Sequence, residues 1–377
     1  MYGKREQDRP IVECDDEGIM YRRVSIDREE VLLKPVRLLD RLGAFRDSKR
    51  PFFASKAYFP WYAYQIARDL KEQQPDIIHI MNFSQYVPLM RRMHANAKFV
   101  LHMECEWLSQ LDKSMISSRL EQIDLVIGCS DYITNKIRTR FPEHASRCQT
   151  VFNGVDLTQF TGKNGTGTVQ QNGAKHLLFS GRISPEKGVH VLLDAFQQVA
   201  KQCPDTQLEL LGAVGIVPMK FIVNLSDEDS VRSLARFYEG DDYLTQLKAK
   251  LSPDVSSKVS FAGFVPHSHL VDNYRRADVL INPSLSEAFG MSLVEAMAVG
   301  TPVVAAQVGG MVDIVEDGKT GLLVEPGNAE ALAAGILSIL SNPELGEAMG
   351  EAGQKRVRDL FTWEQVTKNL DYYYQNL

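Results

Sequence analysis

Long apolar runs and an excess of positive charge are both missing from this 377-residue chain. No apolar run approaches the roughly 18 residues that a membrane-spanning helix needs, and the first ten residues are mostly charged or polar. We therefore expect neither a membrane span nor a signal peptide, and a cytoplasmic location. The formal net charge of -6 leaves no basic footprint for a nucleic acid.

Cysteine is scarce, and clustered metal ligands are missing. The five cysteines are odd in number and include no C-x-x-C pair, so we expect reduced, mostly buried thiols and no zinc site. The acidic residues at 227–229 and 241–242 have no neighbouring histidine or cysteine, and a solvated loop or helix cap explains them. We expect no metal ion and no cofactor. The cysteines are Cys14, Cys105, Cys129, Cys148 and Cys203.

Alternating apolar and amphipathic segments occur in two sets along the chain. The composition, 44% apolar and 24% charged, is that of a soluble globular protein, and the length predicts two domains. In the first half, short apolar runs with helical patterns between them predict a parallel sheet. A polar stretch over 161–173 precedes a second alternating set that begins at His176. The apolar runs are 77–81, 99–103, 125–128 and 150–152, and helical patterns include 58–72 and 131–141.

The two sets predict an α/β fold of two Rossmann-like domains that face each other across a cleft. The expected boundaries are 1–155 for the first domain, 156–175 for a linker, 176–360 for the second domain and 361–377 for a final helix. Ligands bind at the carboxyl ends of the strands in such sheets, so the cleft is the expected binding site.

Two glutamates eight positions apart follow an apolar run in the second set. Residues 278–282 have the pattern of a buried strand, and the apolar residues after the glycine at 290 recur at helical spacing. Glu287 is then on the loop and Glu295 in the first turn of the helix. Such a loop directs unpaired N–H groups at a phosphate or at sugar hydroxyls. Alternatively, residues 292–295 form a capping box, in which Glu295 only bonds back to the Ser292 N–H.

Two cations follow an earlier strand pattern in the same set. Arg182 and Lys187 lie on the loop after residues 177–181, and an amphipathic helix follows. Their charges and the helix dipole would add at one place, which suits a leaving group that gains negative charge, such as a nucleoside diphosphate. The alternative is that both are ordinary solvated loop charges.

These segments together resemble the large E-x7-E family of retaining glycosyltransferases with the two-domain GT-B fold, the glycosyltransferase group 1 type. The likeness continues through 301–324 and weakens toward the N-terminus. It implies that Glu287 contacts the hydroxyls of a donor sugar and that Glu295 binds the ribose of the nucleotide. It also implies that Arg182 and Lys187 bind the diphosphate.

The resemblance extends to backbone contacts with the donor and to one histidine of the first domain. The implied donor-binding positions are Gly181, Phe289, Gly290, Met291, Ser292, Glu295 and Val265, the last within an F-x-G-x-V strand. His102 matches a histidine that hydrogen-bonds the donor sugar, although a satisfied structural histidine is the alternative. With Glu287, Arg182 and Lys187 it completes the implied catalytic set. Glu104, Glu106 and Trp107 are acceptor candidates, because sugar rings stack well on indole.

Three regions depart from the family pattern or extend it. Residues 223–240 look like an insertion of mixed charge, and we expect a surface excursion. The start of the chain resembles the end of a second strand, so the first strand, its glycine loop and its helix are expected to be missing, with exposed sheet edges as a result. The segment at 361–366 resembles the helix that crosses back to the first domain, with packing aromatics.

The resulting hypothesis is a retaining, metal-independent hexosyl glycosyltransferase. Its donor is a nucleotide-sugar, with UDP favoured over GDP or ADP, and its acceptor is an unspecified carbohydrate, lipid or small molecule. The alternative is a non-catalytic nucleotide-sugar-binding relative with a truncated N-terminal domain. A weak membrane-surface association at 138–142 stays open, although a solvated basic helix end explains that segment. The sequence disfavours a nicotinamide dehydrogenase, because 211–215 does not form G-x-G-x-x-G.

Overall fold

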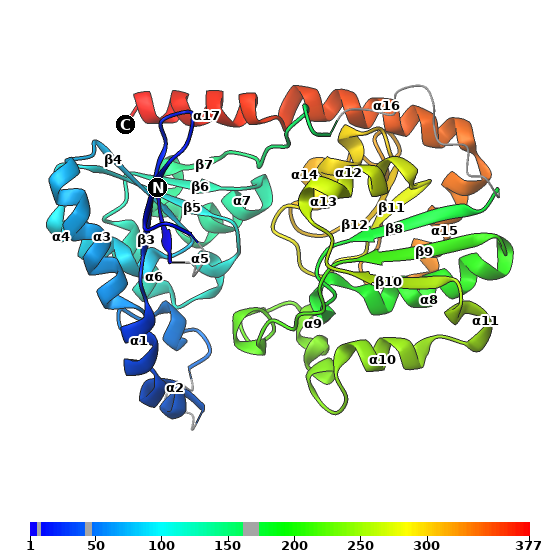
Figure 1. Cartoon of the computed structure of the whole chain (residues 1–377), viewed down its shortest axis with the longest axis horizontal. Coiled ribbons are helices and arrows are strands. Elements are labelled where there is room, and N and C mark those ends of the chain that lie inside the picture. The colour runs from blue at the N-terminus through cyan, green and yellow to red at the C-terminus, as the bar shows by residue number, and fades with distance from the viewer. Residues whose placement is uncertain (6–8, 42–46, 161–172) are drawn as a thin grey trace. The chain divides into compact units, whose positions relative to one another are not determined.

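The computed structural model describes residues 1–5, 9–41, 47–160 and 173–377, which form two compact units (Figure 1). The first unit comprises residues 1–127, 136–149 and 377, and the second comprises 128–135 and 150–376. Most of the polar stretch that was predicted as a linker, 161–172, lies outside the described residues.

The first unit contains two separate sheets. One has the order β1-β3-β2, in which β1 is parallel and β2 antiparallel to β3. The other has the order β4-β5-β6-β7, and β4 pairs with β5 in parallel. The four predicted apolar runs are confirmed as strands, although the last begins and ends two residues early. The bounds are β1 Tyr2–Lys4, β2 Val12–Cys14, β3 Met20–Val24, β4 Ile77–Met81, β5 Lys98–Met103, β6 Leu125–Gly128 and β7 Cys148–Thr150.

Helix α3 shows how the sequence builds this unit. It begins with a proline at its first position, and its buried residues Ala63, Ile66, Ala67 and Leu70 recur every three or four positions. The helices are α1 Asp27–Leu32, α2 Lys34–Arg41, α3 Pro60–Gln73, α4 Val87–Met93, α5 Trp107–Gln110, α6 Lys113–Leu120 and α7 Asp131–Arg140, with 3₁₀ turns at Phe52–Ala54, Ser84–Tyr86 and Pro142–Arg147. The predicted helical patterns at 58–72 and 131–141 are therefore confirmed as α3 and α7.

A cavity of about 560 Å³ is lined by both edge strands β1 and β4 and by α3. Its walls are mostly apolar and include the rings of Tyr58, Tyr62, Phe83 and Tyr86. Within the described ranges, β1 pairs only with β3 and β4 only with β5, so each has one edge without a strand partner. Strands β1 and β4 are thus edge strands of their sheets, and the exposure of these edges stays a prediction.

The second unit is built on one parallel sheet with the order β10-β9-β8-β11-β12-β13. The chain starts in the middle at β8, adds β9 and β10 on one side, then returns to add β11, β12 and β13 on the other. The order therefore reverses between β8 and β11, and ligands bind at such a reversal, beyond the carboxyl ends of the strands. The bounds are β8 Lys175–Ser180, β9 Thr206–Leu211, β10 Val259–Gly263, β11 Val279–Asn282, β12 Val303–Ala306 and β13 Leu322–Val324.

Helices cover both faces of this sheet (Figure 1). Helices α8 and α15 pack together on one face, with α10 beside α8, and α12, α13 and α16 pack on the other. The buried residues of α8 include Val189, Leu192, Leu193, Phe196, Val199 and Ala200, the apolar face of the predicted amphipathic helix. The helices are α8 Val189–Gln202, α9 Asp229–Arg232, α10 Tyr243–Lys250, α11 Pro253–Ser256, α12 His267–Arg276, α13 Met291–Ala298, α14 Met311–Ile314, α15 Ala329–Ser341, α16 Pro343–Leu360 and α17 Trp363–Gln375.

The segment 223–240 is not the surface excursion that its mixed charges predicted. It contains α9 and a 3₁₀ helix at Ser233–Tyr238. Val231, Leu234 and Phe237 are buried in the core of the second unit. Their spacing of three suits 3₁₀ geometry, in which residues i and i+3 share a face. The prediction was wrong because charged residues lie between the three buried positions, and the apolar spacing is then hard to recognise in the sequence.

The aromatic residues near the C-terminus differ from each other in burial. Phe361, between α16 and α17, is fully buried, and its ring makes edge contacts with the rings of Phe152 and Phe289. Trp363, the first residue of α17, is 53% exposed. The prediction that the aromatics of this segment are packing residues is therefore confirmed for Phe361 and wrong for Trp363.

Candidate functional site

Two loops meet where the strand order of the second unit reverses. The loop after β8 ends at Gly188, which has a φ of +68°, and the loop after β11 begins at Pro283. A Cβ on Gly188 would lie 2.0 Å from the Pro283 carbonyl oxygen, so only glycine fits. The Leu285 N–H donates to the Glu186 carbonyl oxygen at 2.8 Å. The two loops therefore hold each other in place backbone to backbone.

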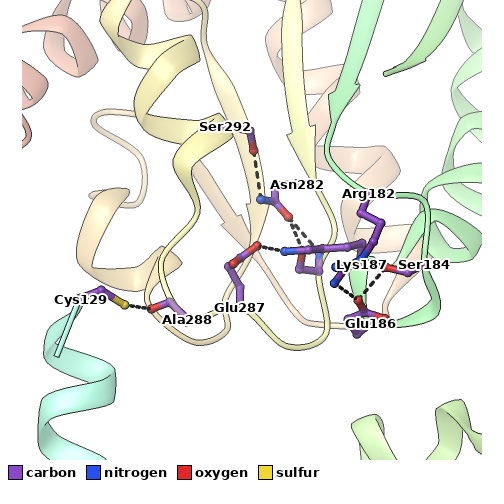
Figure 2. A network of polar contacts seen from close by, with 10 residues as sticks. Cys129, Arg182, Ser184, Glu186, Lys187, Asn282, Glu287, Ala288 and Ser292 are labelled. Atoms are coloured by element: carbon purple, nitrogen blue, oxygen red, sulfur yellow. Dashed lines mark hydrogen bonds and ion pairs between the residues drawn. The ribbon is translucent and has the colours of Figure 1, made fainter. Parts of the chain in front are cut away.

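Asn282, at the end of β11, fixes the start of the second loop (Figure 2). Its buried side-chain oxygen accepts from the Ser284 hydroxyl at 2.6 Å and from the Ser284 N–H at 3.2 Å. Its amide nitrogen donates to the Ser292 hydroxyl at 3.4 Å, across to the first turn of α13. The sequence analysis treated this residue only as the end of a strand.

Arg182 is paired with a buried carboxylate. Its guanidinium donates to Glu186 Oε1 at 2.7 Å, and the Ser184 hydroxyl donates to the same oxygen at 2.6 Å. Glu186 is 2% exposed, whereas the Arg182 side chain is 43% exposed. The second oxygen of Glu186, Oε2, has no hydrogen-bond partner within the described part of the chain. Glu186 was not predicted from the sequence, although its spacing of four from Arg182 is the usual one for an ion pair.

Lys187 is paired with the loop glutamate. Its Nζ lies 2.6 Å from Glu287 Oε2, and both side chains are largely buried (Figure 2). The structure thus brings together three residues that the sequence assigned to catalysis, Glu287, Arg182 and Lys187. Lys187 is not an ordinary solvated loop charge, because it is largely buried against a carboxylate, whereas Arg182 contacts a carboxylate but stays 43% exposed. With both ion pairs counted, the cluster of two cations and two carboxylates is formally neutral.

The N-terminus of α13 shows that the capping-box interpretation is wrong. The residue before the helix is Gly290, with a φ of +122°, and no side chain caps this end. Ser292 is already inside the helix, and Glu295 makes its hydrogen bonds elsewhere. The N–H groups of Met291 and Ser292 belong to the first turn of α13. Phe289 is 3% exposed and packs on the rings of Phe152 and Phe361, so its side chain serves the core.

Glu295 forms hydrogen bonds with two residues of α12. It is 5% exposed; its Oε1 lies 2.8 Å from His267 Nε2, and its Oε2 accepts from the Tyr274 hydroxyl at 2.6 Å. Burial, and next the charge of Glu295, raise the pKa of Tyr274 well above its usual value, so the hydroxyl stays a donor. His267 and Tyr274 were not predicted from the sequence. Their spacing of seven on one helix, which places both on the same face, is the signal that could have found them.

The remaining predicted donor-binding positions, Gly181 and Val265, each follow a strand of the second unit. Gly181 directly follows β8, and its N–H donates to the Leu211 carbonyl oxygen at 2.9 Å. Val265 lies between β10 and α12, two positions before His267, and is partly buried. The hydrogen bond from His267 to Glu295 therefore ties the segment that contains Val265 to α13.

His102 lies in the first unit, near the end of β5. Burial, and to a smaller extent the neighbouring His79, lower the pKa of His102 to about 4, so the ring is neutral at neutral pH. Its Nε2 is 3.3 Å from Glu104 Oε1 but lacks the alignment of a hydrogen bond, and no other described residue supplies one. Within the described residues, the Nε2 of His102 therefore lacks the hydrogen bond that a satisfied structural histidine would have, and the role of His102 with a donor sugar stays a prediction. A buried ring nitrogen in this state is ready for a polar ligand atom.

The three acceptor candidates follow β5 in the same unit, and each has contacts of its own. The Glu104 N–H donates to the Asn82 side chain at 2.7 Å, and Glu106 accepts from Lys136 Nζ at 2.7 Å. The Trp107 ring lies 4.7 Å from the ring of Phe53, centroid to centroid. These contacts fix the three residues in place, and their role with an acceptor stays a prediction.

The described residues lack both a cluster of metal ligands and a membrane-spanning helix. They contain no group of three or more His, Cys, Asp or Glu residues that could hold a metal ion. No helix among them has the length and apolar character needed to cross a bilayer.

Two family models of glycosyltransferases match the chain, one in each half. The family model "Glycosyl transferases group 1" matches residues 167–356, half of the chain, and the model "Glycosyltransferase Family 4" matches residues 23–159. Spore coat protein SA of Bacillus subtilis (strain 168) is 26% identical over 323 residues, which are 82% of this chain and 80% of that protein. D-inositol 3-phosphate glycosyltransferase of Thermobifida fusca (strain YX) is 30% identical over 302 residues, 75% of this chain and 63% of that protein.

Solved structures show the same fold. Sucrose-phosphate synthase from Thermosynechococcus elongatus superposes with a TM-score of 0.72 at 23% identity, covering 100% of this chain and 88% of that one. HepE from Anabaena, in complex with UDP and glucose, superposes with a TM-score of 0.64 at 22% identity, covering 84% of this chain and 82% of that one. The chain therefore belongs to the glycosyl transferases group 1 family and has the two-domain GT-B fold.

Proposed function

We propose that this glycosyltransferase is a retaining, metal-independent enzyme that transfers a hexose from a UDP-sugar to a carbohydrate, lipid or small-molecule acceptor. The observation that carries the proposal is the Lys187–Glu287 ion pair, which lies beside the Arg182–Glu186 pair at the reversal of the strand order. Cations at that place suit a diphosphate, and a carboxylate beside them suits sugar hydroxyls. The UDP and UDP-glucose complexes of HepE, a protein of similar fold, support the choice of UDP.

In this proposal each charged group has a separate task. Glu287 accepts from hydroxyls of the donor hexose, and Lys187 and Arg182 bind the diphosphate oxygens. Glu295 accepts from the ribose, and the backbone from Gly181 and from 289–292 lines the donor. His102, with its unpartnered Nε2, is assigned to a hydroxyl of the donor hexose. Glu104, Glu106 and Trp107 are assigned to the acceptor.

The two cations take the place of a metal ion in this mechanism. As the bond between the anomeric carbon and the diphosphate oxygen breaks, negative charge grows on the diphosphate, and positive groups fixed beforehand stabilise it. The acceptor oxygen bonds to the anomeric carbon on the same face of the sugar, and its proton passes to the departing diphosphate. The Lys187 ammonium group then interacts with both Glu287 and the diphosphate, so donor binding weakens the Lys187–Glu287 ion pair.

Nucleotide release from UDP-, GDP- and ADP-hexoses tests the proposal. We expect release from the UDP-sugar, unchanged by EDTA. Lys187→Ala should lower kcat/KM by roughly 10²–10³, the usual cost of removing one stabiliser of transition-state charge. Lys319→Ala is the matched control, because Lys319 forms an exposed ion pair with Glu316 at 2.6 Å on the surface of the same unit.

Three outcomes would contradict parts of this proposal. A loss of rate with EDTA would contradict metal independence, and a loss below threefold in Lys187→Ala would contradict its role at the diphosphate. Nucleotide binding without release under all conditions would favour the alternative hypothesis, a non-catalytic nucleotide-sugar-binding protein.

A further inference from the structure

Each carboxylate oxygen of Glu295 forms a hydrogen bond with a side chain of α12. The proposed transfer reaction does not use either of these two side chains. Tyr274, fully buried, donates to Glu295 Oε2 at 2.6 Å, and its oxygen lies 3.0 Å from the Ser180 hydroxyl at the end of β8. The Tyr274 carbonyl oxygen accepts from the Thr301 hydroxyl at 2.6 Å. Tyr274 is therefore fixed at both its backbone and its ring.

His267 contacts the other oxygen from the solvent side. Its Nε2 lies 2.8 Å from Glu295 Oε1, and its side chain is 61% exposed, whereas that of Glu295 is 7% exposed. The ring of Phe160 lies 5.2 Å from that of His267 and 6.1 Å from that of Tyr274, centroid to centroid. Each oxygen of Glu295 thus has one donor, and the two donors come from the same face of α12.

The two donors occupy only some of the hydrogen-bond acceptor positions of the Glu295 carboxylate. An ionised carboxylate has about four acceptor positions, so two donors leave about two for a ligand. Burying a carboxylate without partners is costly, and the two donors offset that cost before any ligand binds. Two remaining acceptor positions on one planar group match two neighbouring hydroxyls, such as the 2′ and 3′ hydroxyls of a ribose.

We propose that Tyr274 and His267 are positioning residues, which fix the Glu295 carboxylate in the orientation that accepts both ribose hydroxyls and so make the donor site selective for ribonucleotides. This inference rests on the proposed function, which places a nucleotide at Glu295. Neither residue needs to contact the nucleotide. Each acts through Glu295, and the loss of either leaves the carboxylate free to rotate away from the ribose.

Calorimetric titration with UDP and with 2′-deoxy-UDP tests the inference, because the ratio of the two dissociation constants isolates the ribose contact. For the unaltered protein we expect UDP to bind about tenfold tighter, the value of one hydrogen bond to a charged acceptor. In Tyr274→Phe, which keeps the ring, the ratio should fall to about threefold or less as the UDP contact weakens. His267→Ala should act in the same direction, and His267→Gln, which keeps a donor, should recover most of the ratio.

Tyr243→Phe is the matched control. Tyr243 is also a fully buried tyrosine of the second unit, but its hydroxyl contacts His190 at 2.9 Å. This variant should lower the melting temperature without changing the ratio. One result would overturn the inference: an unchanged ratio in both Tyr274→Phe and His267→Ala. If both nucleotides lose affinity equally while the ratio stays the same, the two residues have a merely structural role. If the unaltered protein binds none of UDP, GDP and ADP, the proposed function fails and the inference fails with it.

Discussion

Single residues of the proposed donor site were predictable from the sequence, but their partners were not. The turn between β11 and α13 placed Glu287 on a loop and Glu295 in a helix, because the change from strand to helical spacing is local. Their partners are distant along the chain: Lys187 is 100 positions from Glu287, and His267 is 28 positions from Glu295. Only the strand order brings such residues together. Glu186 is only four positions from Arg182, but no sequence motif marks a carboxylate as the buried partner of a cation.

Glu186 gives a prediction about how Arg182 is held. In Glu186→Gln the side-chain volume is kept, but Arg182 loses a charged acceptor at 2.7 Å. A hydrogen bond to a charged group contributes about 1.5–3 kcal/mol, so we expect kcat/KM for the donor to fall about tenfold or more. Steady-state kinetics with a varied donor concentration measures this loss.

The control for this substitution is an ion pair of equal spacing. Asp359→Asn changes the exposed pair of Lys355 and Asp359, which are also four positions apart and 2.6 Å from each other. Exposed pairs contribute little, so this variant should keep its kinetics. Equal kcat/KM in Glu186→Gln and the unaltered protein would show that Arg182 needs no counter-charge.

At the scale of elements, long amphipathic helices and buried strands were predictable, and short 3₁₀ segments were not. Helix α8 was recognised because Val189, Leu192, Phe196 and Val199 are apolar and recur at helical spacing, and all four are buried. The segment 223–240 was misjudged because its buried residues follow a spacing of three through a short, charged stretch. Its Phe237 ring packs 4.4 Å from His190 of α8 and 5.4 Å from Tyr243 of α10. The segment is therefore part of the core on which α8 rests.

Phe237→Ala tests this assignment. Phe237 is 8% exposed, and removing a buried ring from a core costs about 3–5 kcal/mol, so urea denaturation should show a loss of that order for the second unit. Phe264→Ala removes the same ring from a position that is 75% exposed and should change the free energy of unfolding by about 0.5 kcal/mol or less. Equal urea midpoints for the two variants would show that Phe237 is not part of the core and that the segment lies on the surface.

At the scale of the whole molecule, the sequence alternates between strand and helix patterns in two separate sets, and this predicted two α/β units. The structure has parallel strand pairs in both units. What the alternation did not predict is the split of the first unit into two sheets. Strand order depends on contacts between distant segments, and a run such as Ile77–Met81 has the same composition at the edge of a sheet as in its middle.

This difference between the units predicts different protection of backbone amides from hydrogen exchange. In the second unit, β8 and β11 lie inside a six-stranded sheet and have a strand on each side, with helices on both faces. In the first unit, β1 and β2 are the two edges of a three-stranded sheet, and all three residues of β2 are exposed. Exposed hydrogen bonds with few apolar contacts open at a low free-energy cost, whereas core strands open only with the cooperative unit around them.

We therefore expect exchange in the order β1 and β2 first, then β4, then β8 and β11, when peptides are followed by mass spectrometry over seconds to hours. Strand β5 is the internal control, because it belongs to the first unit but has β4 on one side and β6 on the other. It should exchange more slowly than β4. If β1 and β4 were as protected as β5, their free edges would have to be covered in solution, and the cavity of about 560 Å³ that both strands line would be the place to look for the cover.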